Sequence, residues 1–447
     1  MVNNSRLPSE ILRYIFQDLS YIDWYSCSCT CWTWNGIANM FLYKNVCWLS
    51  DESYQKLMLA LTTSNSTSIS SYTRASARQK QLGSLINLME LRIRIFSFLS
   101  SDLWYLPPLS TLASMTPNVH TVYVRDSREF IEVPSAFDYA SKWPKLNTLV
   151  LSSLAYYLSS NTINFIDVLN RLQHLDIVYA YSFPEYILPL SPIRLKLQSL
   201  KICIFNQLQY EGAKMIIECC RDSLNTLVIS WEVTDESHPP LSLDNLILGL
   251  PNLKVLGLTY TFHSKFTISS FGEQLEELEI HVNKARREQL EELIGGVLKK
   301  TTNLKTLSLG TKVSPFVEDI PMVIQSNLAT LQNLYLSCSS GNNLLTSLIM
   351  MDVRSENLST LSFECMNFSD YMIRSLAGIF PKLEYMDLTR GRLSLGQPWI
   401  MKESLSLFRY LKGINAKTMF SELVDPSRYN FAKYDLERLS ILPATYI

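Results

Sequence analysis

Three cysteines alternate along a short N-terminal stretch, and they are the nearest approach of this sequence to a metal-binding motif. They are Cys27, Cys29 and Cys31. We expect this stretch to be helical, and alternate residues of an α-helix diverge by about 200° around the axis. The three thiols would therefore not converge on one ion, and the first histidine of the chain, His120, is far away in sequence. We interpret the cysteines as small buried hydrophobes and expect neither a metal nor another cofactor.

The five histidines are not accompanied by partners that would make them catalytic. They are His120, His174, His238, His263 and His281. The sequence contains no phosphate-binding loop, dinucleotide fingerprint or nucleophile elbow around them or elsewhere. His174 and His281 fall at positions that we expect on a protein surface, where contact with a partner explains them better than catalysis does. We therefore expect that the chain is not an enzyme.

Composition excludes several functional classes. The 447 residues are 47% hydrophobic and 18% charged, with a formal net charge of -1. This balance is not that of a disordered chain, and it gives no electrostatic reason to expect nucleic acid or an anionic membrane as a partner. We expect no membrane span, because no apolar run reaches about 18 residues. The first six residues lack the apolar core of a signal peptide, and the nine cysteines are scattered. A cytoplasmic or nuclear location is the expectation.

An internal repeat organises most of the chain. An apolar residue is followed by a second apolar residue three positions later and a third two positions after that, with copies about 27 residues apart on average, within the range of a leucine-rich repeat. Twelve copies begin at Leu88, Val119, Leu146, Leu172, Leu197, Leu224, Leu253, Leu275, Leu304, Leu331, Leu358 and Leu383. The last two apolar residues of each copy are two apart, so a strand would turn both to one face.

The stretches between the copies predict helices, for example over 210–219, 286–294 and 370–377. A strand and helix repeated in this way bury their apolar faces by stacking on the next copy. Residues 82–415 therefore resemble the leucine-rich-repeat family, which implies an α/β solenoid with parallel strands along a concave side. The family usually has Asn or Cys three residues after the last apolar position, and here only Asn283 conforms. We expect irregular turns.

The N-terminal residues do not share the repeat. A stripe of apolar side chains predicts a short helix over 7–19, in which Pro8 suits the first helical position and Glu10 complements the positive helix end. Asp23 is a plausible cap for a second helix, and a third follows from Trp34 onward. Three helices in about 40 residues make a core that is marginal alone.

This N-terminal module resembles the F-box. The matching positions are Leu7, Pro8, Glu10, Ile11, Leu12, Ile15, Phe16, Leu19, Asp23, Cys31 and Trp34. The resemblance implies a three-helix fold and a Skp-type adaptor as partner, which links the chain to a cullin–RING ligase. It also implies that apolar residues enter the adaptor groove as a helix-in-groove contact. The residues assigned to adaptor binding are Leu7, Pro8, Ile11, Leu12, Ile15, Phe16 and, in support, Trp34. The alternative is that the stripe only packs against the first repeats.

Four segments follow from these patterns: an F-box over 1–46, a linker over 47–81, the solenoid over 82–415 and a C-terminal cap over 416–447. The linker contains a Ser/Thr-rich run over 62–73, which we interpret as a flexible loop. A closing helix over 431–439 would shield the last repeat.

Two features of the predicted concave side are candidates for target binding. Its early copies are basic and include Arg92, Arg94 and Arg125, whereas its later copies are acidic and include Glu277 and Glu279. A surface polarised in this way would select the orientation of a target, although ordinary solvated strand residues explain the same pattern. The second feature is aromatic: the eighth position of four consecutive copies is occupied by Tyr179, Ile204, Trp231 and Tyr260. They would form either an exposed anchor or part of the core.

The F-box resemblance and the repeats together indicate the substrate-recognition subunit of a Skp–cullin–F-box ubiquitin ligase. In this interpretation the F-box binds the adaptor and the repeats hold an unknown protein target. The alternative is a non-catalytic leucine-rich-repeat scaffold, or an inhibitor-like binding module, that acts outside ubiquitination.

Overall fold

A computed structural model of the chain describes a large part of the repeats and part of the N-terminal module. The residues that it describes are 9–19, 23, 26–27, 30, 34, 37–38, 45–47, 90–95, 116–126, 140–152, 162–178, 194–205, 207–231, 247, 249–260, 274–282, 301–311, 324–327, 329–338, 341–350, 353–364, 367–368, 370–387, 392–393, 404 and 406–415. The chain divides into two compact units, residues 1–197 and 198–447, here called unit 1 and unit 2.

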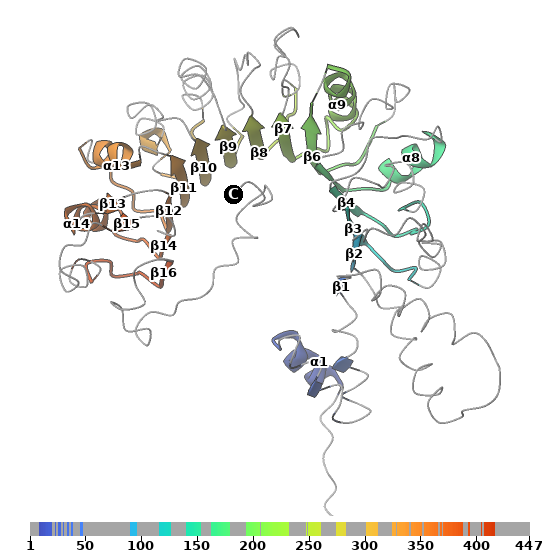
Figure 1. The fold of residues 1–447 in the computed structure, drawn as a ribbon, viewed down its shortest axis with the longest axis horizontal. Coiled ribbons are helices and arrows are strands. Elements are labelled where there is room, and N and C mark those ends of the chain that lie inside the picture. The colour runs from blue at the N-terminus through green and yellow to red at the C-terminus, as the bar shows by residue number, and fades with distance from the viewer. Residues whose placement is uncertain are drawn as a thin grey trace, which may run out of the picture. The chain divides into compact units, whose positions relative to one another are not determined.

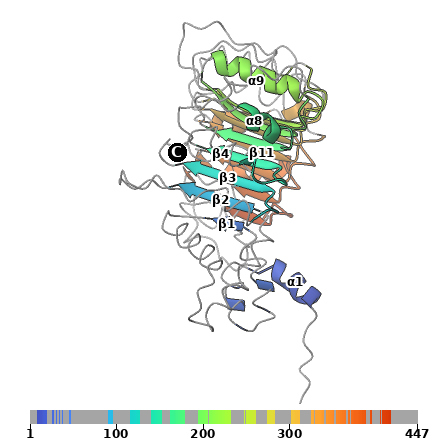
Figure 2. The ribbon, with the colours of Figure 1, turned by 90° about the vertical axis from the view of Figure 1, so that its right-hand side faces the viewer.

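Unit 1 contains an N-terminal helix and a run of parallel strands. Its elements are α1 (Ser9–Gln17), β1 (Asn45–Cys47), β2 (Glu90–Ile95), β3 (Thr121–Asp126), β4 (Thr148–Ser152), α8 (Thr162–Leu169) and β5 (His174–Val178). Each strand pairs in parallel with the next from β1 to β5, and Figure 2 shows β1 to β4 stacked one above another.

Unit 2 continues the same pattern. Its elements are β6 (Ser199–Ile204), α9 (Gln207–Cys219), β7 (Thr226–Trp231), β8 (Val255–Tyr260), β9 (Glu277–Val282), β10 (Thr306–Thr311), β11 (Asn333–Cys338), α13 (Gly341–Met350), β12 (Thr360–Glu364), β13 (Asn367–Phe368), α14 (Asp370–Ile379), β14 (Tyr385–Asp387), β15 (Arg392–Leu393) and β16 (Gly413–Asn415). The strands from β6 to β12, then β14 and β16, pair in parallel. Within this unit α9, α13 and α14 lie on the outer side of the strands (Figure 1).

Each of the twelve predicted copies coincides with a strand, and the expected α/β solenoid with parallel strands is confirmed. Equivalent repeat positions are exact neighbours in the pairing, as with Leu227 and Leu256 or Leu278 and Leu307. Where the structure describes them, the side chains at these positions are buried and face the interior, from β3 to β14. Burying a leucine contributes about 1.5–3 kcal/mol, so the repeated stripe supplies most of the driving force for stacking.

The predicted helices over 210–219 and 370–377 are present as α9 and α14. The predicted helix over 286–294, the Ser/Thr-rich run over 62–73, the closing helix over 431–439 and Asn283 lie outside the described residues. Strands β1 and β16 extend the strand runs beyond the repeats found in the sequence. The residues of β1 begin inside the range that we assigned to the F-box, and they pair with β2.

A backbone ladder locks successive copies together at the residue after each leading leucine. In unit 2 the amide of Lys254 donates to the carbonyl of Asn225 at 2.8 Å, and the amide of Glu276 donates to that of Lys254 at 2.8 Å. The buried side chain of Asn327 adds a second link, since it accepts from the Leu304 amide at 3.0 Å and donates to the Thr301 carbonyl at 2.9 Å. Buried backbone groups that pair in this way avoid a penalty of about 1–3 kcal/mol each. The irregular turns that we expected after the strands lie mostly outside the described residues.

Candidate functional site

Helix α1 presents two apolar faces side by side. Leu12 and Phe16, one turn apart, are buried. Ile11 and Ile15, also one turn apart, are 48% and 43% exposed, and Tyr14, which lies beside Ile11 on the helix surface, is 72% exposed. A helix advances by about 100° per residue, so the exposed residues form an arc beside the buried one. An exposed apolar arc on this nine-residue helix is a candidate binding surface.

The buried face of α1 packs against the other helical residues of the module. Leu12 and Phe16 form a core with Ile37 and Ala38, and the ring of Trp34 meets that of Phe16 edge to face at 5.5 Å between centroids. Residues 23, 26–27, 34 and 37–38 are helical, as the three-helix expectation requires. Burial raises the pKa of the Cys27 thiol, with the Asp23 carboxylate adding to the shift. The raised pKa keeps this thiol neutral at pH 7.

The structure divides the residues that we assigned to adaptor binding. Ile11 and Ile15 are on the surface, whereas Leu12 and Phe16 lie in the core of the module and Trp34 supports them. Leu12 and Phe16 are not accessible for direct contact, and their packing holds α1 in place within the module. Leu7 and Pro8 lie outside the described residues. Tyr14 was not predicted, because a tyrosine beside an isoleucine stripe carries no distinctive sequence signal.

The position of Trp231 decides against its role in an exposed aromatic anchor. This residue ends β7 and is almost fully buried, and its ring contacts that of Tyr210 on α9 edge to face at 5.8 Å. The strand extends through the eighth repeat position, which has the same parity as the inward fourth and sixth positions. Ile204 and Val282 occupy the same position in β6 and β9 and are also buried. Tyr260 ends β8 in register with Trp231, but its side chain, like Tyr179, is outside the description.

The predicted basic residues lie on strands of unit 1. Arg92 and Arg94 belong to β2 and Arg125 to β3, and the pairing brings Arg94 beside Arg125. These three side chains lie outside the described residues.

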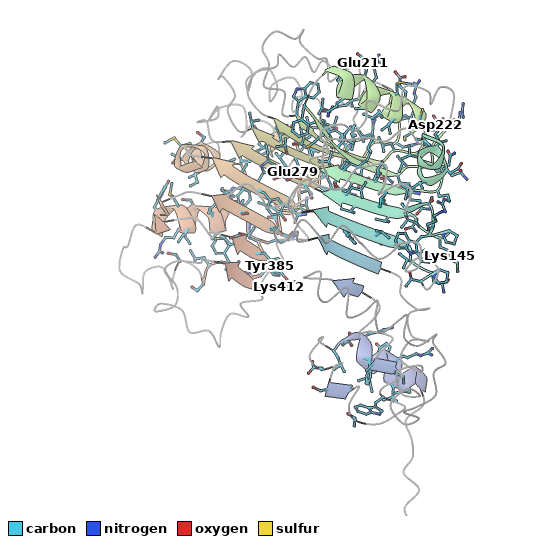
Figure 3. All side chains as sticks on the ribbon, turned by 45° about the vertical axis from the view of Figure 1, so that its right-hand side comes forward. Lys145, Glu211, Asp222, Glu279, Tyr385 and Lys412 are labelled. Carbon is cyan, nitrogen blue, oxygen red and sulfur yellow. The ribbon has the colours of Figure 1, made fainter. Side chains whose placement is uncertain are left out.

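The predicted acidic residues lie on β9 of unit 2. Its third, fifth and seventh repeat positions are Glu277, Glu279 and His281, on the side of the strands away from the helices, here called the open face. Figure 3 shows Glu279 on the strand layer, whereas Glu211 lies on α9. The Nε2 atom of His281 is 2.8 Å from Oε1 of Glu279. Burial raises the pKa of the Glu277 carboxyl above its usual value, and the charges of Glu276 and Glu279 raise it further against an opposing effect of Lys305.

A different set of charges lies at the edge of the strands. Glu276 accepts from Lys305 at 2.6 Å and from Lys254 at 2.9 Å, and Lys412 pairs with Glu384 at 2.8 Å. The hydrogen bonds from the two lysines lower the pKa of Glu276 to about 2. These pairs are solvent-exposed links between neighbouring copies, and such pairs contribute little stability.

Within the part of the chain that the structure describes, no cluster of three or more His, Cys, Asp or Glu side chains is arranged to hold a metal ion. In the same residues no helix has the length and apolar character needed to cross a bilayer.

Comparison with protein families identifies the N-terminal module. Residues 4–48 match the family model described as F-box-like. The chain therefore carries an F-box-like domain at its N-terminus, followed by a leucine-rich-repeat type of fold, as the sequence predicted. An F-box-like domain implies an adaptor that binds it. No curated protein matches the sequence of the chain.

Solved structures with a similar fold are distant from this chain. A chain from the crystal structure of the Rad7 and Elc1 complex in yeast is 16% identical, with a TM-score of 0.42, and the match covers 88% of this chain and 96% of that one. A protein from Bacteroides fragilis is 12% identical, with a TM-score of 0.29, over 78% of this chain and 86% of that one. A chain of a TLR13–ssRNA13 complex is 15% identical, with a TM-score of 0.33, over 75% of this chain and 44% of that one.

Proposed function

We propose that this chain is the substrate-recognition subunit of a Skp–cullin–F-box ubiquitin ligase. Its F-box-like domain would bind a Skp-type adaptor, and its repeats would hold a protein target. The observation that carries the proposal is the pairing of an F-box-like domain with a stack of parallel repeats in one chain. The repeats offer a row of outward strand positions for recognition, and the domain offers a short helix with an exposed apolar arc.

The docking surface in this proposal is the arc formed by Ile11, Tyr14 and Ile15. These side chains lie within one turn of one another, which suits a helix that enters an apolar groove. An isolated three-helix module has little core, so covering the arc also stabilises the fold of the module. Leu12, Phe16 and Trp34 keep α1 in position from within.

The chain would act by proximity rather than by bond chemistry. Bringing a target close to the ligase raises its effective concentration, and this alone accelerates transfer. We propose that the chain itself is not an enzyme, that it needs no cofactor, and that it works in the cytoplasm or the nucleus beside a cullin–RING ligase. The target is a protein whose identity a capture experiment with the full chain would reveal.

The test is co-purification of the full chain with a Skp-type adaptor. Ile15→Glu places a charge in the exposed arc, and we expect it to weaken adaptor binding by at least tenfold, because a buried unpaired charge costs several kcal/mol. Gln17→Glu introduces the same residue at an exposed position of the same helix outside the arc and should bind normally. Equal adaptor binding by both variants, or no binding by the unaltered chain, would refute the proposal.

The alternative function is that of a non-catalytic repeat scaffold or inhibitor-like module. A scaffold or inhibitor-like module would bind its target through the same repeats, but binding would not lead to ubiquitin transfer. Reconstitution with adaptor, cullin and ubiquitin-charging enzymes separates the two, because a receptor supports ubiquitin transfer to a captured target. A scaffold would bind the target and leave it unmodified.

A further inference from the structure

Glu279 occupies an unusual environment for a surface carboxylate. It lies at the centre of β9 on the open face and is only 6% exposed. Its neighbours across the pairing are Gly257 on β8 and Ser308 on β10, neither of which carries a charge. The partner of the carboxylate is His281, two residues along the same strand, at 2.8 Å. A carboxylate as buried as this one would bind a further hydrogen-bond donor strongly, because charges removed from water form strong hydrogen bonds.

The strands on either side of His281 make room for this pair. Gly310 on β10 is the register neighbour of His281, and a Cβ atom at Gly310 would overlap the imidazole ring. A glycine inside a strand marks a close approach of another group, and here that group is the ring of His281. The ring is thus held over the backbone of β10 with its Nε2 atom directed to Glu279.

On the other side of His281, the Thr259 hydroxyl is an independent sign of a missing ligand. Thr259 is the register neighbour of His281 on β8 and is 9% exposed. Its Oγ1 atom is buried and makes no hydrogen bond to any group of the described residues. A buried hydroxyl without a partner costs about 1–3 kcal/mol. A donor that arrived beside the Glu279–His281 pair would be placed to satisfy it.

The negative character extends along the open face from β9 to β14. Asp387 on β14 and Tyr335 on β11 share the fifth repeat position with Glu279. Burial raises the pKa of Tyr335 to about 12, and the charges of Asp387 and Glu277 add to this effect. No lysine or arginine occupies a third, fifth or seventh repeat position within the described strands from β7 to β14. The nearest cation at the edge, Lys305, is engaged with Glu276.

We propose that this acidic surface, formed by Glu277, Glu279 and Asp387 together with the neutral Tyr335, binds an extended basic segment of the target. One cationic side chain would lie over the Glu279–His281 pair and a second near Asp387. The inference rests on the proposed function, since it takes the open face as the face that holds the target. Charge complementarity selects the occupant: a surface that concentrates carboxylates at low exposure attracts arginine or lysine and repels acidic segments.

The spacing of the two cations follows from the strand geometry. Four strand-to-strand steps separate β9 from β14, and each step is about 4.8 Å, so the carboxylates of Glu279 and Asp387 are about 19 Å apart along the sheet. An extended peptide advances about 3.4 Å per residue. The two basic residues of the ligand should therefore be about six residues apart.

A fluorescence-anisotropy titration of the full chain without adaptor tests the proposal. The probe is a fluorescein-labelled Gly/Ser peptide with two arginines six positions apart. One control peptide has the same composition with adjacent arginines, and a second has glutamates in place of the arginines. We expect the spaced arginine peptide to bind most tightly and the glutamate peptide not to bind. Glu279→Gln and Asp387→Asn should each weaken binding of the spaced peptide about three- to tenfold.

Glu356→Gln is the matched control variant, because Glu356 is an exposed carboxylate outside the open face and should leave peptide binding unchanged. Thermal unfolding of each variant checks that the fold is intact. The inference is overturned if the spaced peptide does not bind at millimolar concentration, or if Glu279→Gln and Asp387→Asn bind it as the unaltered chain does. Adaptor co-purification is measured on the same protein, so a failure of this inference is distinguishable from a failure of the F-box proposal.

Discussion

Truncation of Trp231 to alanine tests whether the eighth repeat position belongs to the core. The Trp231 side chain is almost fully buried between β7 and α9, where its ring meets Tyr210. Burying a tryptophan removes about 150–250 Å² from water, which corresponds to about 4–6 kcal/mol as an upper limit. Truncations of this kind cost about 3–5 kcal/mol in practice, and we expect Trp231→Ala to fall in that range.

Urea unfolding followed by far-ultraviolet circular dichroism measures this loss. For a slope of about 3 kcal/mol per molar urea, the expected loss lowers the midpoint by about 1–2 M. Because repeat arrays can unfold in stages, the shift is expected in the transition that involves unit 2. Tyr371→Ala removes an exposed aromatic ring from α14 and should stay within about 0.5 kcal/mol of the unaltered chain.

The reasoning would be refuted if Trp231→Ala unfolded at the same urea concentration as the unaltered chain. Normal stability combined with loss of target capture would place the ring on the surface and restore the aromatic anchor that the sequence allowed. If Trp231 is a core residue, Trp231→Ala should lower the stability of the fold and reduce the signal in every functional assay to the same extent.

Two further substitutions and one pH titration follow from the same contacts. Gly310→Ala should destabilise unit 2 by about 1–3 kcal/mol, because the added methyl group overlaps His281 and the strand is already packed. Gly378→Ala on α14 meets no neighbouring atom and should instead stabilise by about 0.5–1 kcal/mol, and thermal unfolding compares the two. The lowered pKa of Glu276, about 2 against an ordinary 4.5, means that its pairing with Lys254 and Lys305 stabilises the fold above pH 4.5. This contribution is lost as the pH falls from 4.5 towards 2, so Glu276→Gln should flatten the acid limb of the stability profile, and a profile unchanged by the substitution would contradict the assignment.

The repeat was predictable because one physical requirement recurs in every copy. Inward positions such as Leu227, Leu256 and Leu278 must be apolar, and their spacing alone fixes which face of each strand is buried. The short strands β1 and β16 coincide with weaker copies of the pattern, whose last apolar residues are Trp48 and Ala416 instead of the aliphatic or Phe residues of the other copies. Sequence periodicity therefore located the solenoid and was less informative about its two ends.

The candidate sites were harder to predict, because side-chain exposure depends on tertiary packing. Ile11 and Leu12 are adjacent and both apolar, yet one is exposed and the other lies in the core with Ile37. Nothing in their residue types separates them, since the third helical segment decides which arc of α1 it covers. Trp231 is the opposite case. Its parity in the repeat was available from the sequence, and extending the strand by one residue would have placed it inside.

Stability and recognition place different constraints on the glutamates at the open face of β9. Burial and the neighbouring glutamates raise the pKa of Glu277, which means that the folded state holds its charge at a loss compared with water. A solvated carboxylate would keep its ordinary pKa, and Glu276 at the edge shows the opposite shift, because two lysines lower the pKa of its carboxyl. Glu276, which directly precedes β9, and Glu277, which begins it, thus differ in the direction of their pKa shifts. Two lysines compensate the charge of Glu276, whereas no lysine or arginine faces Glu277 from the third, fifth or seventh repeat positions of the described strands from β7 to β14. A basic ligand that crosses β9 would place a cation near Glu277, and part of the binding energy would come from the compensation of this charge.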